Sequence, residues 1–116
     1  MRYLSIYRPE AGEEGGMPSP EHMAAMGRLI EAWTAKGKLI STEPLTPRDR
    51  CARVRLGPDG GFTVSDETQR AGGFAFLEAG SKDEAIELCK TFLKVAGPGT
   101  CEIRQILEFA PQPVAA

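Results

Sequence analysis

A glycine-led apolar run that leads directly into a capped helix constrains this chain more than any other feature. Residues 72–78 read Gly-Gly-Phe-Ala-Phe-Leu-Glu, a pattern typical of a buried strand. Ser81 follows, with Glu84 three places later. This spacing is typical of a capping box, in which each side chain accepts a hydrogen bond from a free amide at the helix start. The segment therefore predicts a strand, a tight turn and an amphipathic helix over residues 82–95.

The first third of the chain has the same order of elements. Residues 2–8 alternate between two faces, as a half-buried strand requires. Ser19-Pro20 is typical of a helix start, with serine as the N-cap and proline at the first helical position. Apolar residues then recur at helical spacing as far as Gly37, a natural C-terminal cap, and residues 39–45 predict the next strand.

Between the two halves, residues 52–64 predict two short strands joined by a turn at Gly57-Pro58-Asp59-Gly60-Gly61. The last strand is expected over residues 100–109, with Cys101, Ile103, Leu107 and Phe109 on one face. The order is βαβ, hairpin, βαβ. It predicts an α+β fold of the ferredoxin-like, split βαβ type, with an inserted β-hairpin and two helices covering one face of an antiparallel sheet. We expect one domain over residues 1–109 and a flexible tail over residues 110–116.

A sheet covered on one face leaves the other face open. We expect that open face to carry Tyr3, Tyr7, Phe74, Phe76 and Leu39, which together are too apolar to remain in contact with water. A second copy of the chain is the simplest cover. The sequence therefore predicts a homodimer whose two sheets face each other.

Composition argues against several classes of partner. The chain has 116 residues and a net charge of −2, so it has no strong positive field to attract nucleic acid or an anionic membrane. No apolar run approaches the roughly 20 residues that span a bilayer, and the N-terminus lacks the features of a signal peptide. We expect a soluble, cytoplasmic protein without nucleic-acid or membrane partners.

The three cysteines, Cys51, Cys89 and Cys101, are odd in number and far apart. Their spacing predicts neither a disulfide framework nor a zinc site, and we interpret them as small buried hydrophobic residues. A single histidine with scattered carboxylates makes no recognisable metal-ligand set, and the glycines near the N-terminus fit no phosphate-binding pattern. We expect neither a metal nor a cofactor.

Several segments carry a family resemblance that covers nearly all of residues 1–109. They are the opening Met-Arg-Tyr-Leu-Ser-Ile-Tyr, the helix start Ser19-Pro20-Glu21-His22-Met23-Ala24-Ala25-Met26, Gly37-Lys38-Leu39, Glu43-Pro44-Leu45, and Thr63-Val64-Ser65-Asp66-Glu67-Thr68 leading to Ala71-Gly72-Gly73-Phe74. Together they resemble the YCII-related proteins, and more narrowly the DGPF branch. One departure is that Asp66 is followed directly by Glu67-Thr68, so the Gly-Pro-Phe that names the branch is missing.

The resemblance implies a dimeric α+β barrel with a cleft between the sheet and the first helix. Most members of the family have no assigned reaction. Some are encoded beside, or fused to, extracytoplasmic-function sigma factors, and a few relatives are dehydrochlorinases of aromatic degradation. The YCII relatives are thought to use a His–Asp pair near the cleft. The resemblance therefore implies either a ligand-binding or accessory role or an acid–base reaction.

His22 is the first candidate catalytic residue. It occupies the third helical position, where the helix dipole disfavours a protonated imidazole, and a neutral imidazole can act as a general base. The histidine position of the family corresponds to Met26, one turn later on the same face. The alternative is a solvent-exposed histidine in the first turn.

Asp49 is the second candidate catalytic residue, because it corresponds to the aspartate of the family when counted from Gly37. The flanking Arg48 and Arg50 would keep it ionised, which favours an orienting role beside His22. The alternative is a loop carboxylate paired with those arginines.

Seven further residues are candidates for ligand binding. Aromatic side chains would line a cavity, Arg53 could hold an anionic group, and the carboxylates could hold a polar group or the dimer partner. The alternatives are core or dimer-interface packing for the aromatic residues and solvated charges for the others. The candidates are Tyr7, Trp33, Arg53, Asp66, Phe74, Phe76 and Glu78.

Two functions follow from these residues. The first is a small dimeric module that binds an apolar or aromatic ligand, or a partner protein such as a sigma factor, at the cleft. The second is a cofactor-free acid–base enzyme of the lyase, isomerase or dehydrochlorinase type, with a small, aromatic substrate and a His22–Asp49 pair. Convergence of His22 and Asp49 on one pocket would favour the enzyme.

Overall fold

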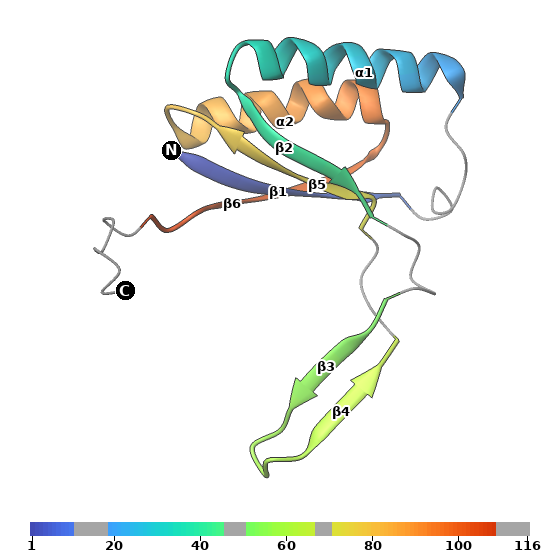
Figure 1. Ribbon diagram of the computed structural model, residues 1–116, viewed down its shortest axis with the longest axis vertical. Coiled ribbons are helices and arrows are strands. Elements are labelled where there is room, and N and C mark those ends of the chain that lie inside the picture. The colour runs from blue at the N-terminus through green and yellow to red at the C-terminus, as the bar shows by residue number, and fades with distance from the viewer. Residues whose placement is uncertain (11–18, 46–50, 67–70, 109–116) are drawn as a thin grey trace, which may run out of the picture.

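The computed structural model describes residues 1–10, 19–45, 51–66 and 71–108. Six strands and two helices make up this part of the chain (Figure 1). In chain order they are β1 (Arg2–Pro9), α1 (Pro20–Ala35), β2 (Leu39–Pro44), β3 (Arg53–Leu56), β4 (Phe62–Ser65), β5 (Gly73–Glu78), α2 (Lys82–Ala96) and β6 (Gly99–Gln105).

The sheet has the predicted ferredoxin-like topology. Its four strands lie in the order β2-β5-β1-β6, and β1 pairs antiparallel with both β5 and β6. Helices α1 and α2 lie side by side on one face of this sheet, and β3 and β4 form a separate hairpin that extends from the opposite side (Figure 1). The predicted α+β class, with two helices on one face and an inserted hairpin, is confirmed.

Both helices begin at the serines that the sequence indicated. The Ser19 hydroxyl accepts a hydrogen bond from the backbone N–H of His22 at 3.1 Å, and the Ser81 hydroxyl accepts one from the N–H of Glu84 at 3.1 Å. The predicted capping box differs in one detail. The Glu84 carboxylate accepts from the N–H of Gly80 at 2.9 Å instead of from that of Ser81. Each cap satisfies amides that the first turn of a helix leaves free.

The core lies between the sheet and α2, and this corrects the predicted content of the open face. Tyr3 is 3% exposed and Leu39 is 8% exposed, so both are core residues. The Tyr7 ring also points toward the helices, where it packs edge-on against Phe92 at 5.3 Å between ring centroids. Its hydroxyl donates to the carbonyls of Gly97 and Pro98, each at 3.3 Å. A buried tyrosine needs such acceptors, and the end of α2 supplies them.

The open face instead carries the residues that alternate along β1 with Tyr3 and Tyr7, together with their partners in β5. In the strand register, Leu4 lies opposite Phe76 and Ile6 lies opposite Phe74. The two phenylalanine rings meet edge-on, with centroids 5.6 Å apart. The prediction for Phe74 and Phe76 is therefore confirmed, whereas Tyr3, Tyr7 and Leu39 belong to the covered face. Sequence alternation defines two sets of residues in a strand but does not say which set faces the helices.

The last strand is shorter than predicted. Cys101 and Ile103 do share the covered face with Tyr7 and Ser5, their partners in β1. The strand ends at Gln105, and Leu107 beyond it is 75% exposed, so its predicted place on that face is wrong. Phe109 and the expected tail over residues 110–116 lie outside the described residues.

The hairpin has a continuous apolar side of its own. Val54 pairs with Val64 and Leu56 pairs with Phe62, so these four side chains lie on one face. They are exposed by 65%, 68%, 62% and 73% respectively. An isolated two-stranded hairpin is marginally stable in water, and this apolar side is a second surface that a partner could cover.

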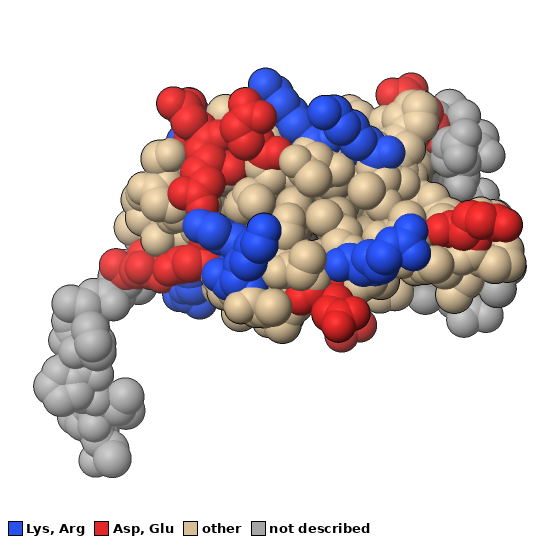
Figure 2. All heavy atoms as spheres, turned by 90° about the horizontal axis from the view of Figure 1, so that it is seen from above, with Lys and Arg blue, Asp and Glu red and all other residues tan. Residues whose placement is uncertain are grey.

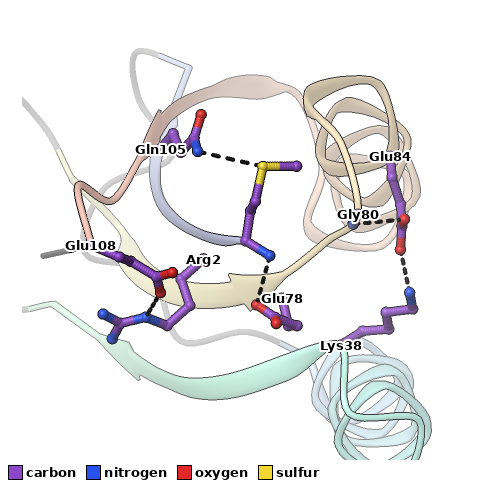
Figure 3. Close-up of polar contacts among 8 residues, drawn as sticks. Arg2, Lys38, Glu78, Gly80, Glu84, Gln105 and Glu108 are labelled. Atoms are coloured by element: carbon purple, nitrogen blue, oxygen red, sulfur yellow. Dashed lines mark hydrogen bonds and ion pairs between the residues drawn. The ribbon is translucent and has the colours of Figure 1, made fainter. Parts of the chain in front are cut away.

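Polar contacts tie the termini of the described chain to one end of the sheet (Figure 3). The N-terminal amine lies 3.4 Å from the Glu78 carboxylate, and the Arg2 guanidinium contacts Glu108 at 2.6 Å. Lys38, in the turn after α1, forms an ion pair with Glu84 at the start of α2. This last contact joins the two halves of the fold through side chains that are about one-third exposed.

Charges of both signs are mixed over the helical layer (Figure 2). Lysine and arginine side chains lie between aspartate and glutamate side chains on the face in view. Within the described part of the chain, no helix is long and apolar enough to cross a membrane.

The Lys38–Glu84 contact makes a prediction about pH. The hydrogen bond from Lys38 is the main reason that the pKa of the Glu84 carboxyl is lowered below its ordinary value of 4.5, and the Gly80 N–H adds to this. Because this carboxyl has a lower pKa in the folded state than in the unfolded state, it stabilises the fold at pH values above its unfolded-state pKa. This contribution is lost as the pH falls through the folded-state pKa. Replacing Glu84 by Gln should therefore lower the free energy of unfolding at neutral pH and weaken its pH dependence in acid.

Urea denaturation at neutral pH and in acid would measure both effects. Glu87→Gln is the matched control, because Glu87 is an exposed carboxylate on the same helix with only a surface ion pair to Lys90. If the free energy of unfolding of Glu84→Gln fell in acid as steeply as that of the wild type, the Lys38–Glu84 contact would contribute nothing to it.

Candidate functional site

A cavity of about 880 Å³ lies between the covered face of the sheet and the two helices. Its position agrees with the cleft that the family resemblance implies between the sheet and the first helix. The apolar side of α1 forms one wall, and no residue of α1 is buried. The side chains of this wall are those whose helical spacing was visible in the sequence: Met23, Met26, Leu29, Ile30 and Trp33.

Small residues of β5 make room for this cavity. Gly73, Ala75 and Leu77 face the helices, and all three border the cavity. Tyr7 and Phe92 close it on the side of α2. The result is a partly open, largely apolar cleft of the size and character that small-molecule sites usually have.

Few polar side chains reach this space, and most of them already have partners. The Tyr7 hydroxyl is bonded to two backbone carbonyls, and the Thr42 hydroxyl donates to the carbonyl of Phe74 at 2.9 Å. His22, at the start of α1, is half-buried and borders the cavity. Among residues 1–10, 19–45, 51–66 and 71–108, its ring makes no hydrogen bond or ion pair.

A group of thiols and one hydroxyl forms part of the wall between β1 and α2. Cys89 borders the cavity, and its sulfur lies 3.6 Å from the Ser5 hydroxyl oxygen. The neighbouring Cys101 thiol, by hydrogen bonding, lowers the pKa of the Cys89 thiol to about 7, against the opposing effect of burial and with help from Ser5. The same contact raises the pKa of the Cys101 thiol.

The structure brings together some of the predicted site residues and separates others. Tyr7, Trp33 and His22 border one cavity. Phe74 borders it too, but its side chain alternates to the open face, so it contributes mainly main-chain atoms. Asp49, with Arg48 and Arg50, lies outside the described residues.

The remaining predicted ligand-binding residues do not border this cavity. Phe76 and Glu78 lie on the open face, and Glu78 contacts the N-terminal amine. Arg53 is exposed on β3, and Asp66 is exposed just after β4. These residues are available to a partner of the open face or of the hairpin.

Sequence reasoning missed Ser5 and Cys89 as site residues. We interpreted Cys89 as a buried hydrophobic residue, and its 8% exposure agrees with burial. Its contact with Ser5 depends on how α2 lies on β1, which no local spacing shows. The strand alternation did place Ser5 on the same face as Tyr7, and this was the available signal.

Across residues 1–10, 19–45, 51–66 and 71–108, no three histidine, cysteine, aspartate or glutamate residues are grouped closely enough to hold an ion. The residues with polar or titratable side chains that border the cavity are Ser5, Tyr7, Ser19, His22, Thr42, Glu43 and Cys89.

Comparisons with known proteins support the fold. No family model matches the chain, and no curated protein matches it. Among solved structures, the chain is similar to 5-chloro-2-hydroxyhydroquinone dehydrochlorinase from Burkholderia phenoliruptrix AC1100, in complex with 2,5-dihydroxybenzoquinone. The TM-score is 0.56 at 20% identity, over 94% of this chain and 96% of that one. The two proteins share the α+β fold, while the YCII and DGPF names remain predictions.

The wall formed by α1 makes a prediction about Gly27. This glycine lies inside the helix, and an added Cβ would meet no atom within 4 Å. Glycine inside a helix costs roughly 0.5–1 kcal/mol relative to alanine. Gly27→Ala should therefore raise the free energy of unfolding by about that amount, as measured by urea denaturation.

Gly99→Ala provides the contrast. A Cβ at Gly99 would lie 2.6 Å from the carbonyl oxygen of Arg8, so this variant should be destabilised. Loss of stability in Gly27→Ala would mean that α1 is packed more tightly at this position than the structure shows.

Proposed function

We propose that the cavity binds a small aromatic molecule and that His22 transfers a proton in a cofactor-free reaction on it. The observation that carries this proposal is the placement of the chain's single histidine at the edge of a largely apolar cavity. The fold shared with a dehydrochlorinase supports the same class of reaction. Lyase, isomerase and dehydrochlorinase reactions all belong to this class.

The walls suit a flat, apolar ligand with few polar groups. Methionine, leucine and tryptophan side chains of α1 face glycine and alanine of β5 across the cavity. Methionine adapts its shape to an aromatic ring and makes favourable sulfur–ring contacts. A bound ring would also remove apolar surface of α1 from water, which amounts to about 25 cal/mol per Å².

The chemistry assigned to His22 is proton removal. A neutral imidazole nitrogen can accept a proton from a ring hydroxyl or an acidic C–H of the ligand, and the electrons left behind can expel a leaving group such as chloride. Asp49 remains the proposed partner that orients the imidazole. Arg53 has no part in this proposal, because it does not border the cavity.

Binding without turnover is the second candidate function. The specific observation in its favour is that α1 has no buried residue, so a ligand would complete the packing of this helix. A protein that gains order on binding suits a regulatory or accessory role. The association with sigma factors remains an implication of the family resemblance.

The first test of this proposal measures binding. We expect 2,5-dihydroxybenzoquinone to bind the wild-type protein in isothermal titration calorimetry. Ala75→Phe should abolish binding because its ring would occupy the cavity, and His22→Gln should still bind. A folded Ala75→Phe protein that binds as well as the wild type would place the ligand elsewhere.

The second test measures turnover. We expect the wild type to release chloride from 5-chloro-2-hydroxyhydroquinone, and His22→Gln to do so at least about a hundredfold more slowly, as loss of a general base predicts. His22→Gln activity equal to that of the wild type would remove the imidazole from the chemistry. Binding by the wild type without chloride release would favour the binding function over this reaction.

We also propose that the protein is a homodimer joined through the open face of the sheet. Leu4, Ile6, Phe74 and Phe76 form an apolar centre on this face, and ion pairs such as Arg8–Glu102 lie around it. An apolar centre within a charged rim is the usual composition of a protein–protein interface. The exposed apolar side of the hairpin offers further surface to the same partner.

Sedimentation velocity at micromolar concentration would test this assembly. We expect the wild type to sediment as a dimer and Leu4→Glu as a folded monomer, since a carboxylate would be buried in the apolar centre. Lys90→Glu is the control, because Lys90 lies exposed on α2 and should leave the dimer intact. A wild-type monomer, or a dimeric Leu4→Glu protein, would contradict the proposal.

A further inference from the structure

Two cysteines on different elements, one of which borders the cavity, pack in the same core. Cys89 lies on α2 and is a core residue, and Cys101 on β6 packs against the same core. In the sheet, Cys101 lies opposite Tyr7 of β1, two residues from Ser5 on the same face. The Ser5 hydroxyl is 3.6 Å from the Cys89 sulfur, so the two thiols and the hydroxyl form one group.

This group has an approach route and an asymmetric arrangement. Cys89 borders the cavity and is 8% exposed, so of the two cysteines it is the one beside the space that a small molecule would enter. Cys101 does not border the cavity. Hydrogen bonds from the Cys101 thiol and the Ser5 hydroxyl favour the Cys89 thiolate, which is the reactive form of a cysteine.

We propose that Cys89 and Cys101 form a reversible thiol–disulfide pair in the cavity wall, in which Cys89 reacts first with a small peroxide and Cys101 then resolves it. This role is independent of any aromatic ligand. It gives the cavity a second chemistry, oxidation by hydrogen peroxide or a small organic peroxide, that the proposed proton transfer does not use.

The reaction balances in two steps. The Cys89 thiolate attacks one peroxide oxygen, so that an S–O bond forms, the O–O bond breaks and hydroxide (or alkoxide) leaves. The Cys101 sulfur then attacks the sulfur of the Cys89 sulfenic acid. An S–S bond forms, the S–O bond breaks, and water leaves with the proton of the Cys101 thiol. The two cysteines lose two electrons in total, and these reduce the peroxide.

Ser5 has a positioning role in this scheme. Its hydroxyl supports the thiolate of Cys89 through the 3.6 Å contact and does not itself react. Ser5→Ala should keep the fold, because alanine fits the space of serine, and should slow the reaction of Cys89 with a thiol reagent several-fold. A structural role alone would leave that rate unchanged.

The full chain, treated with a small excess of hydrogen peroxide, provides the main test. Peptide mapping by mass spectrometry without reductant should show a Cys89–Cys101 linkage that disappears after treatment with dithiothreitol. Cys101→Ser should stop at the sulfenic acid of Cys89, which a dimedone probe would trap. Cys51→Ser should form the same linkage as the wild type, because Cys51 lies on the segment before β3.

Several results would overturn the proposal. One is a peroxide-treated wild-type protein in which Cys89 remains a free thiol, and another is a disulfide that includes Cys51. Equal dimedone labelling of Cys89 in the wild type and in Cys101→Ser would show that Cys101 does not resolve it. Because the mapping is made on the wild type, the test remains decisive if a cysteine variant fails to fold.

Discussion

The position of β1 at the centre of the sheet is the constraint on which the rest of the structure depends. It is bonded on one side to β5 and on the other to β6, so its two faces set the character of both sides of the molecule. Tyr3, Ser5 and Tyr7 face the helices, whereas Leu4 and Ile6 face away. A slip of one residue in this register would exchange the two sets, expose the tyrosines and remove the contact between Ser5 and Cys89.

Local signals were sufficient for the elements and their order. Serines at helix starts, a glycine-rich turn and strict alternation have causes within a few residues, and the structure follows them at Ser19 and Ser81. What the sequence could not supply is the choice between two equivalent faces. The sequence predicts Tyr3 and Tyr7 on the open face, but the acceptors for the Tyr7 hydroxyl lie at the end of α2, which is distant in sequence.

The candidate site was predictable to the same degree. Trp33 was identified because it is an aromatic residue of the helically spaced apolar set, and His22 because it is the only histidine and lies in the first helical turn; both border the cavity. Cys89 was not identified, because its role depends on its contacts with Ser5 and Cys101. These residues lie on β1 and β6 and come close to Cys89 on α2 only in the folded chain. Residues whose role comes from their own element can be read from a sequence, while residues whose role comes from a neighbouring element cannot.

The alternation of small and large residues in β5 explains why the cavity and the apolar open face occur together. Gly73 and Ala75 point toward the helices, and Phe74 and Phe76 point away. The small side chains leave space beneath α1, and the large ones place two rings on the far side of the same strand. A larger residue at position 75 would fill the cavity, and a smaller one at position 74 or 76 would weaken the open face. Strand β5 thus contributes both the space for a ligand and the surface for a second copy of the chain. The proposed ligand binding and the proposed dimerisation therefore depend on the same six residues, Gly73–Glu78.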